Sequence, residues 1–127
     1  MADDSPTPSD LLKFERDEDF ASLYANHIYY ETTVWDLKLI FGQLDLNRGP
    51  NLVTQHTAIA LSWLQVKIMS YFLQVNLAIY EAAHGTIKIP PAVIPPEPPL
   101  PTENDSAARL TTEKIQEIRR RLLEDKQ

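Results

Sequence analysis

Cysteine is absent from this 127-residue sequence, and glycine occurs only three times. Without cysteine the chain has no disulfide framework, no thiolate metal site and no cysteine nucleophile. The isolated glycines provide no glycine-rich loop for a phosphate, and no serine stands in the glycine-flanked turn of a hydrolase. These absences exclude several large enzyme classes, so we expect a non-enzymatic protein without a cofactor.

Basic residues and long apolar runs are also scarce. Twelve lysines and arginines stand against 18 acidic residues, a net charge of -6 that disfavours nucleic acid as the main partner. The least charged stretch, Ile68–Tyr80, includes Ser70, Gln74 and Asn76 and is shorter than the roughly 20 apolar residues of a membrane-spanning helix. The acidic start lacks the pattern of an export signal, which predicts a cytoplasmic protein with no membrane partner.

The remaining composition is that of a globular protein, with 43% hydrophobic and 24% charged residues. It changes along the chain and predicts four segments. These are an acidic flexible segment over residues 1–19, a folded body over 20–89, a linker over 90–101 and a helical tail over 102–127. Seven of the twelve linker residues are proline, which favours an extended polyproline II spacer.

Two runs near the start of the body have the alternation of β-strands. Val34–Leu44 places Trp35, Leu37, Leu39 and Phe41 on one face and Asp36, Lys38 and Ile40 on the other. Leu23–Thr33 is rich in tyrosine and isoleucine and predicts a second strand, which we pair with the first through a turn at Glu31–Thr33. A short strand at Asn51–Val53 would complete a three-stranded antiparallel sheet.

A long helix is expected next, from an N-cap at Thr54 to a stop at Gly85. It carries two apolar stripes. The first contains Leu61, Leu64, Ile68, Phe72, Val75 and Ile79, and the second contains Ile59, Trp63, Val66, Met69, Leu73, Leu77 and Tyr80. A small sheet covers only one stripe, so the second predicts the interface of a homodimer or higher homo-oligomer. The expected fold is α+β, with the sheet packed on this one long helix.

The tail predicts a short helix that docks on another protein. Thr111 is the expected N-cap, and Ile115, Ile118 and Leu122 form a narrow apolar stripe for the partner. The cluster of Arg119, Arg120 and Arg121 is largely matched by acidic residues four positions away on the same helix. The proline-rich linker would carry the helix away from the body, or would itself be the ligand of an aromatic-lined groove.

A competing interpretation concerns the aromatic side chains of the sheet. Tyr24, Tyr29, Tyr30 and Trp35 could form a platform on which a single-stranded nucleic acid or a small ligand stacks. Such platforms usually come with a basic groove, which this body lacks. The same aromatics also serve an ordinary packed sheet, so this remains the second interpretation.

Few residues suggest chemistry. His27, His56 and His84 are scattered, with no pair at the helical spacing of a metal site, so no metal is expected. Glu31 and Asp36 could form a carboxylate pair for acid–base catalysis, but a polar sheet face explains them equally well. No catalytic or metal-ligating residue is therefore assigned.

Four pieces of the body, in this order and spacing, resemble the small prokaryotic family called domain of unknown function 3467. The pieces are Leu23-Tyr24-Ala25-Asn26-His27, Trp35 to Phe41-Gly42, Val53-Thr54-Gln55-His56, and Ile79-Tyr80-Glu81 to Gly85. The resemblance covers about residues 20–90. Because the family has no assigned activity, it implies a fold and a homologous group but no catalytic residues. The leading expectation is a small homo-oligomeric scaffold or adaptor.

Overall fold

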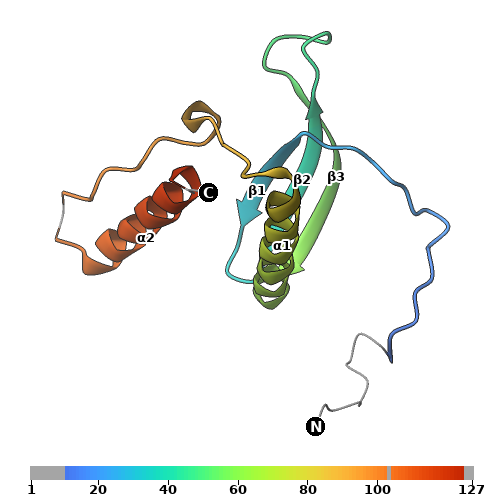
Figure 1. The fold of residues 1–127 in the computed structure, drawn as a ribbon, viewed down its shortest axis with the longest axis horizontal. Helices are drawn as coiled ribbons and strands as arrows, with labels where there is room; N and C mark the ends of the chain where they lie inside the picture. Colours follow the sequence, from blue (N-terminus) through green and yellow to red (C-terminus); the bar gives the residue numbers. More distant parts are fainter. Residues whose placement is uncertain (1–10, 103, 125–127) are drawn as a thin grey trace. The chain divides into compact units, whose positions relative to one another are not determined.

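The computed structural model describes residues 11–102 and 104–124, which leaves residues 1–10 of the predicted acidic segment and 103 and 125–127 of the predicted tail outside the described residues. Its elements are β1 (His27–Thr32), β2 (Asp36–Leu44), β3 (Val53–Ser62), α1 (Trp63–His84), a 3-10 turn (Pro91–Val93) and α2 (Ser106–Leu123) (Figure 1). The predicted α+β class is confirmed. The chain divides into two compact units, Met1–Trp63 and Leu64–Gln127.

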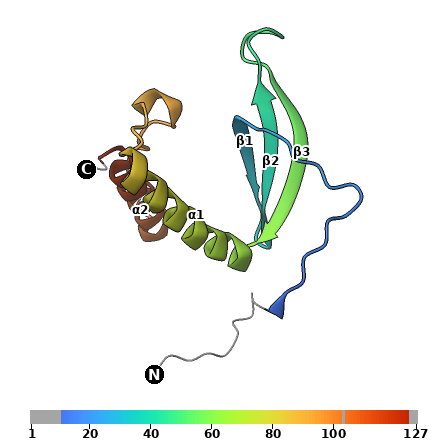
Figure 2. The same ribbon diagram turned by 45° about the vertical axis from the view of Figure 1, so that its right-hand side comes forward.

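The three strands form one antiparallel sheet in the order β1-β2-β3, and Figure 2 shows them side by side. The predicted hairpin is present, with its turn one to two residues later than expected. Thr33 builds this turn, since its hydroxyl oxygen accepts hydrogen bonds from the amides of Trp35 (3.1 Å) and Asp36 (3.0 Å). The same hydroxyl donates to the Asp36 carboxylate (2.9 Å), which closes a hydroxyl-directed turn.

The third strand corrects the sequence analysis. Val53–Ser62 is a ten-residue strand, where a short strand and then helix from Thr54 were expected. The prediction was wrong because this segment contains no proline or glycine to interrupt a helical pattern. Its β-branched residues and its pairing along the whole of β2 favour the strand. Helix α1 begins at Trp63 and has 22 residues, about 33 Å at 1.5 Å per residue.

One face of the sheet is apolar, as the alternation in β2 predicted. Residues directly opposite in an antiparallel pair share a face, and the register groups Ile28, Tyr30, Leu37, Leu39, Phe41, Ile59 and Leu61. The other face carries Glu31 and Lys38, whose charged groups lie 4.0 Å apart. Within the part of the chain that the structure describes, Leu37 and Leu39 are the only buried hydrophobic residues. The interior is therefore very small.

Helix α1 ends where Gly85 was predicted to stop it. Gly85 has a positive φ of 92°, and its amide donates to the Glu81 carbonyl oxygen (2.8 Å). The Glu81 carboxylate accepts from the amide of Ile87 (2.7 Å), which fixes the chain leaving the helix.

Helix α2 begins earlier than predicted. Asp105, not Thr111, is its N-cap, and the carboxylate accepts from the amides of Ala107 (3.0 Å) and Ala108 (3.1 Å). Aspartate is among the best N-cap residues because it accepts these otherwise unpaired amide hydrogens. Thr111 lies within the helix.

Candidate interaction surfaces

The three histidines lie on separate elements. His27 is on β1, His56 is on β3 and His84 ends α1, where its ring lies 4.6 Å from that of Tyr80. His56 lies in the segment where a helix from Thr54 was expected, and β3 replaces that helix. Among the described residues, no group of three histidine or carboxylate side chains could hold a metal ion, and the buried Nδ1 of His27 has no hydrogen-bond partner.

The two carboxylates considered for catalysis have separate partners. Asp36 accepts from Thr33 within the hairpin turn, and Glu31 faces Lys38 across the strand pair. Each carboxylate therefore has a local structural role. The two carboxylates are therefore bound to separate groups and not to each other.

Parts of the first three family-like pieces of the sequence meet at one end of the sheet. The side chain of Asn26 makes the pair of hydrogen bonds to Leu44 that the backbone of a neighbouring strand would make. Its oxygen accepts from the Leu44 amide (2.7 Å), and its nitrogen donates to the Leu44 carbonyl oxygen (3.2 Å). The backbone amide of Asn26 also donates to the Gly42 carbonyl oxygen (3.1 Å). The segment before β1 is thereby fixed to β2.

His56 holds the same segment to β3. The sheet register skips His56 at an irregularity between Phe41 and Gly42, so His56 is the extra residue of a β-bulge. Its Nε2 donates to the Tyr24 carbonyl oxygen (3.2 Å), because a carbonyl only accepts, and its Nδ1 lies 2.8 Å from the Thr57 hydroxyl. We call Asn26, Gly42 and His56 the sheet-end cluster.

A small pocket lies beside the sheet-end cluster and encloses about 210 Å³. It is lined by Ala21, Leu23, Ala25, Phe41, His56, Thr57 and Ile59. Pockets for drug-sized ligands usually span roughly 300–1,000 Å³. Both ring nitrogens of His56 are already engaged with other groups of the chain. The sheet-end cluster is therefore best explained as a structural feature that holds the segment before β1 to β2 and β3.

The aromatic residues proposed as a stacking platform are not brought together. Tyr29 and Tyr30 are neighbours on β1 and point to opposite faces of the sheet. Trp35 lies in the hairpin turn and Tyr24 precedes β1. All four are exposed, but they do not share one face.

Helix α1 keeps the two-stripe pattern, although its predicted first members lie elsewhere. Ile59 and Leu61 belong to β3, and the indole nitrogen of Trp63 donates to the Thr33 carbonyl oxygen (3.0 Å). No residue of α1 is buried. In the second stripe Val66 and Met69 are half-buried, while Leu73, Leu77 and Tyr80 are exposed; in the first, Leu64, Ile68, Phe72, Val75 and Ile79 are exposed.

The proline-rich segment is not a free spacer. It runs along α2, because Gln116 donates to the Pro98 carbonyl (2.8 Å), Arg119 Nε donates to the Pro95 carbonyl (2.9 Å) and Arg120 pairs with Glu97 (2.6 Å). The sequence analysis expected this segment to carry α2 away from the body as an extended spacer. Instead, its residues 95–98 lie against α2. Of the predicted arginine pairs, Arg121 does bind Glu117 four residues before it (2.7 Å).

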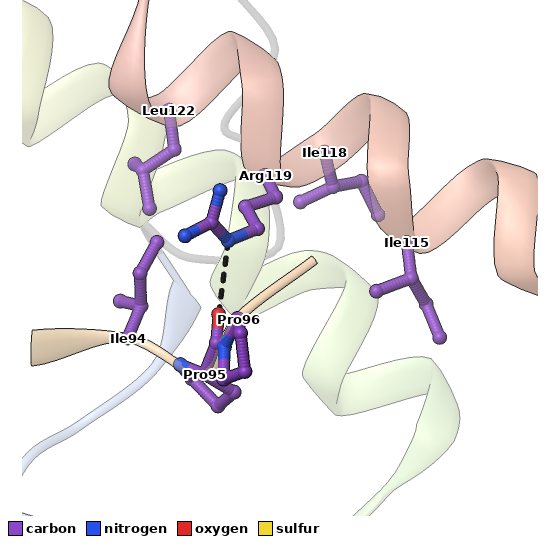
Figure 3. A pocket seen from close by; sticks show the side chains of 7 residues that line it. All are labelled: Ile94, Pro95, Pro96, Ile115, Ile118, Arg119 and Leu122. Carbon is purple, nitrogen blue, oxygen red and sulfur yellow. Dashed lines mark hydrogen bonds between the residues drawn. The ribbon is translucent and has the colours of Figure 1, made fainter. Parts of the chain in front are cut away.

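An apolar groove of about 330 Å³ runs between the proline-rich segment and α2, and we call it the proline groove (Figure 3). It is lined by Ile94, Pro95, Pro96, Ile115, Ile118, Arg119 and Leu122. The predicted docking stripe thus forms one wall. Sequence reasoning missed the other wall and Arg119, because nothing in the order of the residues shows that the prolines fold back on the helix.

The family model for "Protein of unknown function (DUF3467)" matches residues 3–89. The chain belongs to this family. No curated protein and no solved structure matches the chain. The predicted resemblance is confirmed, and the match begins earlier in the chain than the predicted start near residue 20.

The extent of the DUF3467 match separates the two candidate surfaces. The sheet-end cluster and all of α1 lie within the matched residues, whereas the proline groove lies beyond residue 89. None of the helices that the structure describes is long and apolar enough to cross a membrane.

Proposed function

We propose that this DUF3467 protein is a non-enzymatic, homo-oligomeric adaptor that self-associates through α1 and binds another protein through α2. The observation that supports this proposal is the exposed apolar surface of α1. A helix that is apolar around most of its circumference normally lies in the interior of a protein or an assembly. Within the described residues only Leu37 and Leu39 form an interior.

The second stripe of α1 leaves apolar side chains in water. Leu73, Leu77 and Tyr80 are 54%, 50% and 52% exposed on this stripe. With the first stripe included, the side chains of α1 leave on the order of 1,000 Å² in water. Isolated apolar patches on monomers are usually no more than about 300–600 Å².

The charges of α1 favour a second copy as the occupant. Lys67 and Glu81 are its only lysine, arginine or acidic residues, and they lie at nearly equal distances from Gln74 near its middle. In an antiparallel pair of α1 helices, Lys67 would be level with the partner's Glu81. Lys67 of each copy would therefore lie near Glu81 of the other copy, while the residues of the second stripe pack between the two helices.

Two adjacent residues provide a matched test of this interface. Phe72 and Leu73 are 55% and 54% exposed, yet they belong to different stripes of α1. Leu73→Glu should shift the protein from oligomer to monomer at micromolar concentration in light scattering, because each copy would bury a charge. Phe72→Glu should leave the mass unchanged. An unchanged mass for Leu73→Glu would contradict the second stripe as the interface.

The exposed apolar residues of α2 support the adaptor part of the proposal. Ile115, Ile118 and Leu122 are 48%, 66% and 45% exposed along one side of α2. Three adjacent aliphatic side chains at helical spacing are typical of a peptide-recognition surface. Deletion of residues 102–127 should abolish binding of the partner protein. The number of chains in each assembly should stay the same as in the wild type.

A further inference from the structure

The proline groove is open because the proline-rich segment covers a different side of α2. The half-buried residues of α2 are Ala108, Thr112, Gln116, Arg119 and Leu123, which recur every three or four positions and mark the covered side. The apolar stripe lies next to this side. The segment therefore supplies a second wall and leaves the stripe accessible.

The walls of the proline groove are apolar, with one charged group between them. Figure 3 shows Ile115, Ile118 and Leu122 on the helix, the prolines opposite, and the Arg119 guanidinium group between the walls. Arg119 uses Nε for Pro95. Among the described residues no acceptor binds its two terminal nitrogens, which can therefore receive a carboxylate of a ligand.

The charge of α2 identifies the chemistry of the occupant. Of the five basic residues of α2, Arg120 pairs with Glu97 and Arg121 with Glu117, whereas Arg109, Lys114 and Arg119 have no ion pair with another described residue. Two copies of α2 packed together would bring like charges into proximity. An acidic segment would gain from the same charges.

We infer that the proline groove binds an acidic amphipathic segment of another protein, with aliphatic side chains between the walls and a carboxylate on Arg119. This inference rests on the proposed adaptor function and gives the chemical class of its partner. The contact is of the helix-in-groove or extended-peptide kind.

A direct test uses three fluorescein-labelled peptides and the full-length chain. The first peptide has leucines at helical spacing separated by glutamates, the second replaces its glutamates by lysines, and the third replaces its leucines by serines. Fluorescence anisotropy should show saturable binding of the first peptide alone. Equal binding of the lysine or serine peptide would overturn the inference.

Matched variants locate the peptide on the protein. Arg119→Met should weaken binding about tenfold, as expected for a lost charge-assisted hydrogen bond, whereas Arg121→Met, which removes a charge outside the groove, should change it less than about twofold. Ile118→Ser should also weaken binding about tenfold, and Leu110→Ser, about two turns before Ile118 and outside the groove lining, should not. Equal effects within either pair would contradict the assigned site.

Two further measurements separate alternative explanations. Gln116→Met removes a bond to the proline-rich segment without lining the groove, so an effect as large as that of Arg119→Met would overturn the carboxylate contact. Displacement of the acidic peptide by oligothymidylate at equal concentration would indicate a general anion surface instead. Fluorescence anisotropy detects peptide binding whether the protein is a monomer or an oligomer. Loss of self-association is detected separately, as a change in molar mass by light scattering.

Discussion

Replacement of Gly42 by alanine perturbs the sheet-end cluster at its tightest point. A Cβ atom built on Gly42 would lie 2.8 Å from the Thr54 carbonyl oxygen, 2.9 Å from Val53 Cγ1 and 3.1 Å from Gln55 Cα. Two of these neighbours are backbone atoms of β3, which cannot rotate away like the end of a flexible side chain. The strand pair must separate near the bulge at His56.

The expected loss of stability follows from this geometry. Overpacking a tight site costs about 1–3 kcal/mol, and we expect the upper half of this range for Gly42→Ala because backbone must move. The urea midpoint should fall by about 1 M, measured by circular dichroism. Gln43→Ala, at an exposed neighbouring position, should change stability by less than about 0.5 kcal/mol. Equal midpoints for Gly42→Ala and the wild type would refute the close approach of β2 and β3.

Two further predictions concern side chains that satisfy backbone groups. Asn26→Ala removes both bonds to Leu44 and should lower the free energy of unfolding by about 1–3 kcal/mol in urea titrations; Asn26→Asp, which keeps the acceptor, should retain part of it. Asp105→Ala leaves the amides of Ala107 and Ala108 without their cap and should destabilise α2 by about 1 kcal/mol, seen as faster amide exchange in its first turn. Unchanged exchange would show that the cap does not stabilise the helix.

The sequence predicted the elements whose patterns have one structural solution. Alternation in β2 predicted both its strand and its apolar face, and Gly85 predicted the end of α1. The hairpin was predicted with a small shift, because Thr33 directs the turn through its hydroxyl. That preference is weaker than a glycine or proline signal.

The errors have a common physical origin in contacts between distant segments. Ile59 and Leu61 fit two apolar stripes of a helix and also one face of a strand, and only pairing with β2 decides between them. The course of the proline-rich segment along α2 depends on hydrogen bonds from Gln116 and Arg119, which no local pattern reveals. The candidate site was therefore half predicted, as a stripe without its opposite wall.

The molar mass of the full-length chain in solution tests the central proposal most directly. The chain has a mass of 14.5 kDa, so multi-angle light scattering should give about twice this value or a higher multiple at micromolar concentration. A mass of one chain at all concentrations would contradict self-association through α1.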